Sequence, residues 1–343
     1  MKVAVLLSGQ PRFINLSCKF LKEEFSYPDI EFDIFCHYWG DVSFSKKSEG
    51  KYINFKEQIK IANEVLTPKA CLIEGFEDLD KFITNIETIL ITISKNKYKQ
   101  YDNPPKIKRY KWGQHLSLLK AYNLLEKYEE KNNIKYDVII KGRTDFVYKN
   151  KLCYNSEKEY LNYKFLNYLN FTSLIEPQSI TTGCQYQQYS PIQQDPKNSS
   201  WKNVGKTDNF FYPTETWKRD ERNIFRAGDI SLCTNRIAAK KYFGEYLATY
   251  LNTYTKSFFN RNDIFVRHDA VQGDIAINNN IRVFRLKKCR FHRLVNEYDF
   301  KNGWENVEKN KTILIKDIYN TDISYIQEQL IKFANKKGDP APY

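Results

Sequence analysis

Residues 136–148 have the sequence Tyr136-Asp-Val-Ile-Ile-Lys-Gly-Arg-Thr-Asp-Phe-Val-Tyr148. The apolar run from Val138 to Ile140 has the β-branched content expected of a strand that is buried on both faces of a sheet. Charge follows this run, and ligands of open α/β sheets bind where strands end. The pattern therefore predicts one of two arrangements for Arg143 and Asp145. Either the arginine pairs with phosphate and the acid holds a divalent cation, or the two form an ion pair that closes the strand.

The start of the chain predicts a strand, a turn and a helix. Residues 2–7 are a compact apolar strand, and apolar residues recur with helical spacing over residues 13–25. Between them, the backbone amides of the turn and the helix N-terminus can hold an anion, to which Arg12 adds positive charge. A purely structural turn would have the same pattern. The candidates for binding a nucleotide here are Ser8, Gly9, Gln10 and Arg12.

Strands and helices are predicted to alternate through the first half of the chain. Further strands are expected at residues 32–37 and 70–73, and helices at residues 52–66, 77–97 and 112–128. This order favours an α/β fold, with a mostly parallel, right-handed sheet flanked by helices. A lone histidine at a strand end is more often structural than a ligand, so His37 is expected to be a hydrogen-bonded residue of the interior.

The second half has a different composition. Residues 181–206 are rich in Gln, Tyr and Pro, and they predict a long loop that is either a lid or sugar-binding segment or a surface insertion. Strands are expected to begin near residue 227 and at residues 281–286. Helices are expected from residue 236 to about 250, near residues 267–278 and at residues 321–336. The predicted division is residues 1–150, a loop-rich half at 151–300, and a helical extension with a tail at 301–343.

Charge and cysteine content limit the partners and the compartment. Lys and Arg outnumber Asp and Glu by 54 to 41, a net charge of +13 that favours anionic partners such as nucleotides or phospholipid surfaces. Without a dense basic block, no nucleic-acid partner is expected. The seven cysteines are scattered, which is typical of a reduced, cytoplasmic protein. The first apolar run is too short for a signal peptide and no run is long enough to span a bilayer, so any membrane contact is expected to be peripheral.

Four segments carry a family resemblance when they are taken in order. They are Lys2-Val-Ala-Val-Leu-Leu-Ser-Gly-Gln-Pro-Arg-Phe13, Asp33-Ile-Phe-Cys-His-Tyr-Trp39, Tyr136-Asp-Val-Ile-Ile-Lys-Gly-Arg-Thr-Asp145 and Gly228-Asp-Ile-Ser-Leu232. Over roughly residues 1–290 the chain resembles bacterial and viral surface-polysaccharide glycosyltransferase-like proteins, a group similar to the WavE lipopolysaccharide-synthesis proteins. The resemblance implies a GT-A-like (Rossmann-like) fold, in which a nucleotide-diphosphate sugar binds at strand ends and the C-terminal half receives the acceptor.

The resemblance also implies roles for single residues. Its Arg-x-Asp pair falls on Arg143 and Asp145, and its later acid falls on Asp229. GT-A enzymes commonly have Asp-x-Asp at the metal site, so here either Asp145 alone holds Mg²⁺ or Mn²⁺, or Arg143 replaces part of the metal's charge. If the reaction inverts, the base is expected to be Asp229. The further candidates are Asp269, Asp274 and His268.

The expected function is transfer of a sugar from a nucleotide-diphosphate sugar to a hydroxyl of a cell-surface glycan of the capsule or lipopolysaccharide type. Two alternatives remain open at this stage. A nucleotidyl- or phosphotransferase of the same fold would use the same strand-end acid and arginines on phosphates. A non-catalytic glycan-binding protein would bind saccharide and would need neither Asp145 nor a nucleotide.

Overall fold

A computed structural model describes residues 1–40, 55–97, 109–148, 151, 154, 156–161, 179–183, 211–212, 232–244, 247–248, 282–286, 291–296, 312–315 and 321–334. The first half contains β1 (Lys2–Gly9), α1 (Ile14–Glu24), β2 (Glu31–Trp39), α2 (Phe55–Leu66), β3 (Ala70–Glu74), α3 (Phe76–Lys97), α4 (Arg109–Asn132), β4 (Val138–Gly142) and β5 (Phe146–Tyr148). The second half contains β6 (Ser179–Gly183), β7 (Phe211–Tyr212), β8 (Leu232–Asn235), β9 (Arg282–Leu286), β10 (Phe291–Asn296), β11 (Thr312–Ile315) and α10 (Ile323–Ala334).

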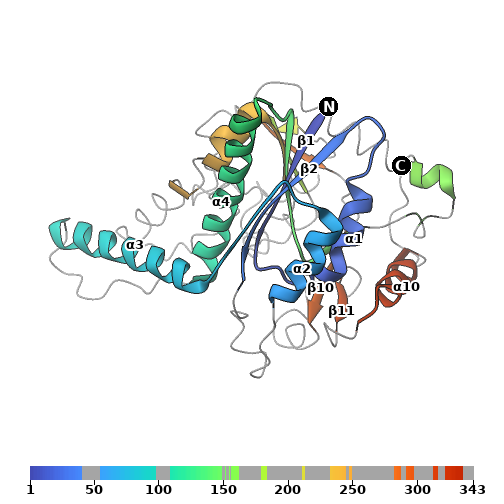
Figure 1. The fold of residues 1–343 in the computed structure, drawn as a ribbon, viewed down its shortest axis with the longest axis horizontal. Helices are drawn as coiled ribbons and strands as arrows, with labels where there is room; N and C mark the ends of the chain where they lie inside the picture. The colour runs from blue at the N-terminus through green and yellow to red at the C-terminus, as the bar shows by residue number, and fades with distance from the viewer. Residues whose placement is uncertain are drawn as a thin grey trace, which may run out of the picture.

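The larger sheet confirms the predicted α/β class. Its strand order is β3-β2-β1-β4-β8-β6-β9-β7, and the first four strands are parallel to one another. Strand β8 is antiparallel to both of its neighbours, β4 and β6. The first five strands therefore form a mostly parallel sheet that is flanked by helices, as the alternation of strands and helices predicted (Figure 1).

The central strands have apolar residues on both faces of the sheet, and both faces are covered by helices. Successive side chains of a strand point to opposite faces. On β1, Ala4 and Leu6 pack with α4, whereas Val3, Val5 and Leu7 pack with α1 and α2. The continuous apolar runs of β1 and β4 are thus explained by helices on each side.

The strand β1 is longer than predicted. Its pairing with β2 continues past Leu7, so that Ser8 lies opposite His37 and Gly9 lies opposite Tyr38. Backbone pairing to a long neighbour therefore holds two polar or flexible residues in the strand, although neither favours a strand by itself. The turn is consequently shorter than the sequence suggested.

A second, smaller sheet brings the C-terminal segment back to the N-terminal half. Its strand order is β11-β10-β5, and it packs with α1 and α10 around a third apolar cluster. Ile326 and Leu330 of α10 are fully buried in that cluster. The predicted amphipathic helix is confirmed, and these two apolar residues are used for packing inside the protein (Figure 1).

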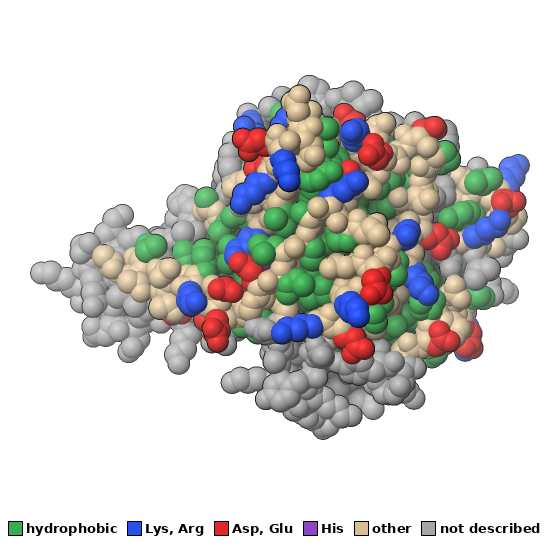
Figure 2. Space-filling model, viewed as in Figure 1, with side chains coloured by type: hydrophobic (Ala, Val, Ile, Leu, Met, Phe, Trp, Pro, Cys, Tyr) green, Lys and Arg blue, Asp and Glu red, His purple; other side chains and the backbone are tan. Residues whose placement is uncertain are grey.

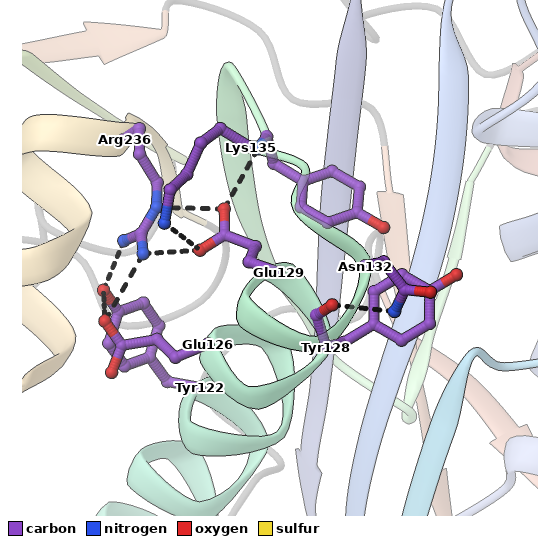
Figure 3. A network of polar contacts seen from close by, with 8 residues as sticks. Tyr122, Glu126, Tyr128, Glu129, Asn132, Lys135 and Arg236 are labelled. Atoms are coloured by element: carbon purple, nitrogen blue, oxygen red, sulfur yellow. Dashed lines mark hydrogen bonds and ion pairs between the residues drawn. The ribbon is translucent and has the colours of Figure 1, made fainter.

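A buried ion pair joins α4 to the segment that follows β8. Arg236 donates from Nη2 and Nε to the two carboxylate oxygens of Glu129, at 2.6 and 3.1 Å (Figure 3). The Glu129 side chain is fully buried, and it also accepts the backbone N–H of Tyr136 at 3.0 Å. Arg236 reaches Glu126 and the hydroxyl of Tyr122 as well. The residues after β8 are thereby attached to the same helix that covers β1.

Two expectations for the second half are corrected. Residues 179–183 form β6, so the predicted loop at 181–206 does not begin at Thr181. The strand forms because Thr181 and Thr182 pair with β8 on one side and β9 on the other. The extension at 301–343 is not only helical, since it contains β11 before α10. The expected helix near residues 267–278 and the rest of the expected loop lie outside the described residues.

The described part of the chain contains no helix that is both long and apolar enough to cross a bilayer. On the face shown in Figure 2, Lys and Arg side chains are interspersed with Asp and Glu rather than gathered in one basic patch. Among the described residues of this face, the positive net charge is therefore distributed rather than concentrated.

Candidate functional site

The candidate site lies where the order of the strands changes direction. From β1 the chain moves outward to β2 and then to β3, and it later returns to place β4 on the opposite side of β1. Leu7 is the register partner of Gly142, so the two neighbouring parallel strands end side by side. In open α/β sheets, ligands bind in the crevice outside the carboxyl ends of strands at such a switch point.

Strands β1 and β4 approach each other closely at this edge of the sheet. A Cβ atom added at Gly142 would lie 2.7 Å from Leu7 Cδ2 and 3.6 Å from Val5 Cγ1. Gly9 has a φ of 103°, a value that L-residues rarely adopt. The two strands therefore end in glycines for different reasons, one for space and the other for backbone conformation.

The turn after β1 is bound to the turn after β4. Arg12 Nε donates to Gln10 Oε1 at 2.8 Å, and the backbone oxygen of Gln10 accepts the Thr144 hydroxyl at 3.0 Å. The Ser17 hydroxyl donates to the backbone oxygen of Thr144 at 2.6 Å. These contacts bring the two predicted segments, residues 8–12 and 143–145, together at one edge of the sheet.

Arg143 and Asp145 form a bidentate ion pair. Nε and Nη2 of Arg143 donate to Oδ1 and Oδ2 of Asp145, each at 2.8 Å. The guanidinium carbon lies 4.9 Å from the centre of the Phe146 ring, which favours a cation–π contact. Asp145 is buried and Arg143 is partly exposed, so the arginine is the member of the pair that a ligand would reach. The ion pair predicted as one alternative is present, and the ligand-binding alternative stays a prediction.

The described residues do not by themselves make a cation site around Asp145. Mg²⁺ and Mn²⁺ favour several oxygen ligands, and both oxygens of this carboxylate already accept from Arg143. No three His, Cys, Asp or Glu side chains come together as a metal site within the part of the chain that the structure describes. Among the described residues, the positive charge beside Asp145 is that of Arg143.

A buried chain of hydrogen bonds lies behind the turn, and no local pattern in the sequence indicates it. The Ser117 hydroxyl of α4 accepts the backbone N–H of Gly9 at 2.6 Å and lies 2.7 Å from His37 Nδ1. The other ring nitrogen of His37 is 2.7 Å from Glu74 Oε2, which also accepts from Lys120. The Gly9 amide is therefore bound to Ser117, and anion binding by this turn would need other donors.

Burial determines the protonation state of the His37 imidazole. Desolvation lowers the pKa of His37 to about 4, although the neighbouring Glu74 acts in the opposite direction. In the neutral ring, Glu74 beside Nε2 favours the proton on that nitrogen, and Nδ1 is the acceptor beside the Ser117 hydroxyl, which also donates to the His37 backbone oxygen at 3.0 Å. Partial burial would raise the pKa of Glu74, but hydrogen bonds from Lys120 and His37 lower it. The expectation that His37 is a hydrogen-bonded structural residue is confirmed.

One unsatisfied donor points to polar chemistry at the turn. Gln10 Nε2 is buried and has no hydrogen-bond acceptor within the described part of the chain, although Gln10 Oε1 is bound by Arg12. An unpaired buried donor costs about 1–3 kcal/mol, so a ligand oxygen placed there would recover free energy. The remaining predicted residues, Asp229, Asp269, Asp274 and His268, lie outside the described residues.

Comparisons with known proteins identify no family for this chain. No protein-family model matches the sequence, and no curated protein matches it. Among solved structures, mouse xyloside xylosyltransferase 1 in its apo form is similar, with a TM-score of 0.42, 10% identity, and coverage of 93% of this chain and 96% of that one. The galactosyltransferase LgtC, in complex with donor and acceptor sugar analogues, has a TM-score of 0.36, 9% identity, and coverage of 97% and 95%.

Proposed function

We propose that this chain is a glycosyltransferase that moves a sugar from a nucleotide-diphosphate sugar to a hydroxyl of a cell-surface glycan, of the capsule or lipopolysaccharide type. The observation that carries the proposal is the β1/β4 switch point, where Arg12 and Arg143 follow neighbouring strand ends. A diphosphate is the ligand chemistry that suits two guanidinium groups at such a place. The four-segment resemblance and the GT-A-like organisation that it implies point in the same direction.

In this proposal the arginines bind and stabilise the leaving diphosphate. Charge builds on the diphosphate as the sugar bond breaks, and fixed cations aimed at that charge lower the barrier. Asp145 orients the Arg143 guanidinium through its two hydrogen bonds, so that the arginine is held in place before substrate arrives. The Ser117 hydroxyl has the corresponding role for the backbone at Gly9.

The acceptor side of the reaction is proposed from sequence alone. Asp229 would accept the proton of the acceptor hydroxyl if the reaction inverts the sugar configuration, because such a transfer needs a carboxylate within hydrogen-bond reach. A Mg²⁺ or Mn²⁺ ion on Asp145 stays a prediction from the sequence, because in the structure both oxygens of this carboxylate accept hydrogen bonds from Arg143. The positive net charge of +13 suits both the nucleotide and a peripheral contact with an anionic, cytoplasmic membrane surface.

A thermal-shift panel tests the proposal directly. A ligand that binds only the folded state raises the melting temperature by mass action. The panel consists of UDP, GDP, ADP and CMP and their sugar conjugates, each with and without Mn²⁺. At least one sugar nucleotide should raise the melting temperature. The enzyme should also release free nucleotide from that sugar nucleotide, at a rate that depends on added glycan acceptor.

Nucleoside triphosphates, sugar phosphates and free saccharides, tested in the same assay, distinguish the alternatives. Stabilisation by a nucleoside triphosphate together with a sugar phosphate, and release of pyrophosphate, would assign a nucleotidyltransferase instead. Stabilisation by saccharides alone, with no response to any nucleotide, would support a glycan-binding protein and overturn the proposed transfer.

A further inference from the structure

Two cysteines lie opposite each other at the edge of the larger sheet. Cys36 on β2 and Cys71 on β3 are register partners in a parallel pair, and β3 is the last strand on that side. Neighbouring strands are about 4.7–4.9 Å apart, and register partners project to the same face. A disulfide joins Cα atoms that are about 4.4–6.8 Å apart, so this pairing suits a direct bond between the two sulfurs.

The surroundings of the two thiols differ. Cys36 is fully buried and accepts the Tyr38 hydroxyl at 3.2 Å. Cys71 is partly exposed, and its sulfur lies 3.7 Å from Asn63 Nδ2. Both are free cysteines, and as register partners they project from the same face of the sheet. One thiol is therefore accessible to a small reagent, and the other is held beside it inside the protein.

The same contacts make the two thiols chemically unequal. A hydrogen bond from Cys36 lowers the pKa of Cys71, whereas burial raises the pKa of Cys36 well above its usual value. The thiolate is the nucleophilic form of cysteine. Cys71, the more exposed of the two thiols, is thus the attacking sulfur, and the buried Cys36 stays protonated until the second step.

We propose that Cys36 and Cys71 form a redox-active dithiol that reacts with low-molecular-weight disulfides. In the first step the Cys71 thiolate attacks one sulfur of the disulfide, the S–S bond breaks, and one thiolate leaves. In the second step the Cys36 sulfur attacks Cys71 Sγ, the bond between Cys71 and the small thiol breaks, and the proton of Cys36 passes to the departing thiolate, which leaves as a thiol. The protein dithiol is oxidised by two electrons, the disulfide is reduced to two thiols, and the site does not depend on the glycosyltransferase proposal.

A third cysteine serves as a control. Cys18 of α1 is buried in the same apolar cluster as Cys36. Its sulfur is 3.5 Å from the backbone oxygen of Asn15, and burial raises its pKa. Because Cys18 lies on a helix rather than on the strand paired with β2, it is not expected to take part.

The test uses the full chain in its folded state. The reduced protein is incubated with oxidised glutathione, remaining thiols are alkylated, and the digested peptides are mapped by mass spectrometry. The expected product links the peptide of Cys36 to the peptide of Cys71, with loss of two hydrogens, and dithiothreitol reverses it. Cys36→Ser should trap glutathione on Cys71, Cys71→Ser should yield neither product, and Cys18→Ser should behave as the parent.

Several results would overturn the proposal. They are a link between Cys18 and Cys36, full alkylation of Cys71 after exposure to oxidised glutathione, and failure of Cys36→Ser to hold glutathione. The melting temperature and circular dichroism of each variant confirm that it is folded. Cys71→Ala provides a second variant at the exposed position, and it too should lose the link if the pairing is correct.

Discussion

The hydroxyl of Ser117 lies 2.6 Å from the backbone nitrogen of Gly9 and accepts its hydrogen bond. This contact connects the middle of α4 to the turn that follows β1, at the edge where the candidate site lies. Both residues are buried, so this hydrogen bond is shielded from solvent. The backbone conformation at Gly9 therefore depends on a helix that follows much later in the chain.

Replacing Ser117 with alanine should leave the Gly9 N–H without an acceptor. A buried unsatisfied donor costs about 1–3 kcal/mol, so the free energy of unfolding should fall by that amount in urea titrations. The matched control is Thr88→Ala on α3, which removes an exposed hydroxyl that donates to Thr84 O at 2.8 Å. The control should change stability by no more than about 0.5 kcal/mol. Equal stability of the two variants would contradict the role given to Ser117.

His37 should make the protein less stable in mild acid. Its pKa is about 4 in the folded state, below the usual value of 6.5, so between these values the unfolded chain binds a proton that the folded chain does not. The resulting stability is present above about pH 6.5 and is lost as the pH falls toward 4. His37→Gln should reduce this slope, as measured by urea unfolding at pH 7.5, 6 and 5. A variant with the same slope as the parent would show that other groups cause the acid sensitivity.

The sequence predicted the parallel core of the fold because strands that are buried on both faces contain recognisable apolar runs. Strands β1, β2 and β4 each contain an apolar run, and helices cover both of their faces. Strand β6 was missed because Ser179–Gly183 is polar and gains its structure from pairing with β8 and β9. Long-range pairing of this kind is not visible in local composition.

The candidate site was predictable only in part, for a similar reason. The turn at residues 8–12 and the Arg143–Asp145 pair each follow an apolar strand, and this position identified them as candidates for ligand binding. Ser117 has no such marker, since its contact with Gly9 spans 108 positions and depends on how α4 lies across the sheet. The link between Thr144 and Gln10 likewise spans 134 positions.

Glu129 should be far more important for stability than its neighbour Glu126, although Arg236 contacts both. The Glu129 side chain is fully buried, whereas that of Glu126 is 39% exposed and lies 3.3 Å from the arginine. Glu129→Gln should lower the free energy of unfolding by roughly 3 kcal/mol, because it leaves the partly buried Arg236 without its main partner. Glu126→Gln should cost less than about 1 kcal/mol. Similar losses in chemical denaturation would contradict this ranking.

The Arg143–Asp145 pair should control turnover if the proposed transfer is correct. Arg143→Ala removes a cation from the leaving diphosphate, and Asp145→Asn releases the arginine from its fixed orientation. Each should lower turnover on the order of a hundredfold, the equivalent of about 3 kcal/mol in the transition state. Glu328→Gln breaks an exposed ion pair with Lys332 on α10 and should leave turnover unchanged. Turnover of folded Asp145→Asn within about twofold of the parent would remove Asp145 from the mechanism.

Arg12 should contribute to nucleotide binding, because it is held by Gln10 at the end of β1. Arg12→Ala should weaken binding of the nucleoside diphosphate by about tenfold, the equivalent of a ~1.4 kcal/mol loss. The loss should be larger at low salt, since the Debye length is about 10 Å at 0.1 M salt and about 30 Å at 0.01 M. Isothermal titration calorimetry at the two salt concentrations measures both effects. Lys22→Ala, at the far end of α1, removes an equal charge and should have no effect. Unchanged diphosphate affinity in Arg12→Ala would show that the turn after β1 is structural only.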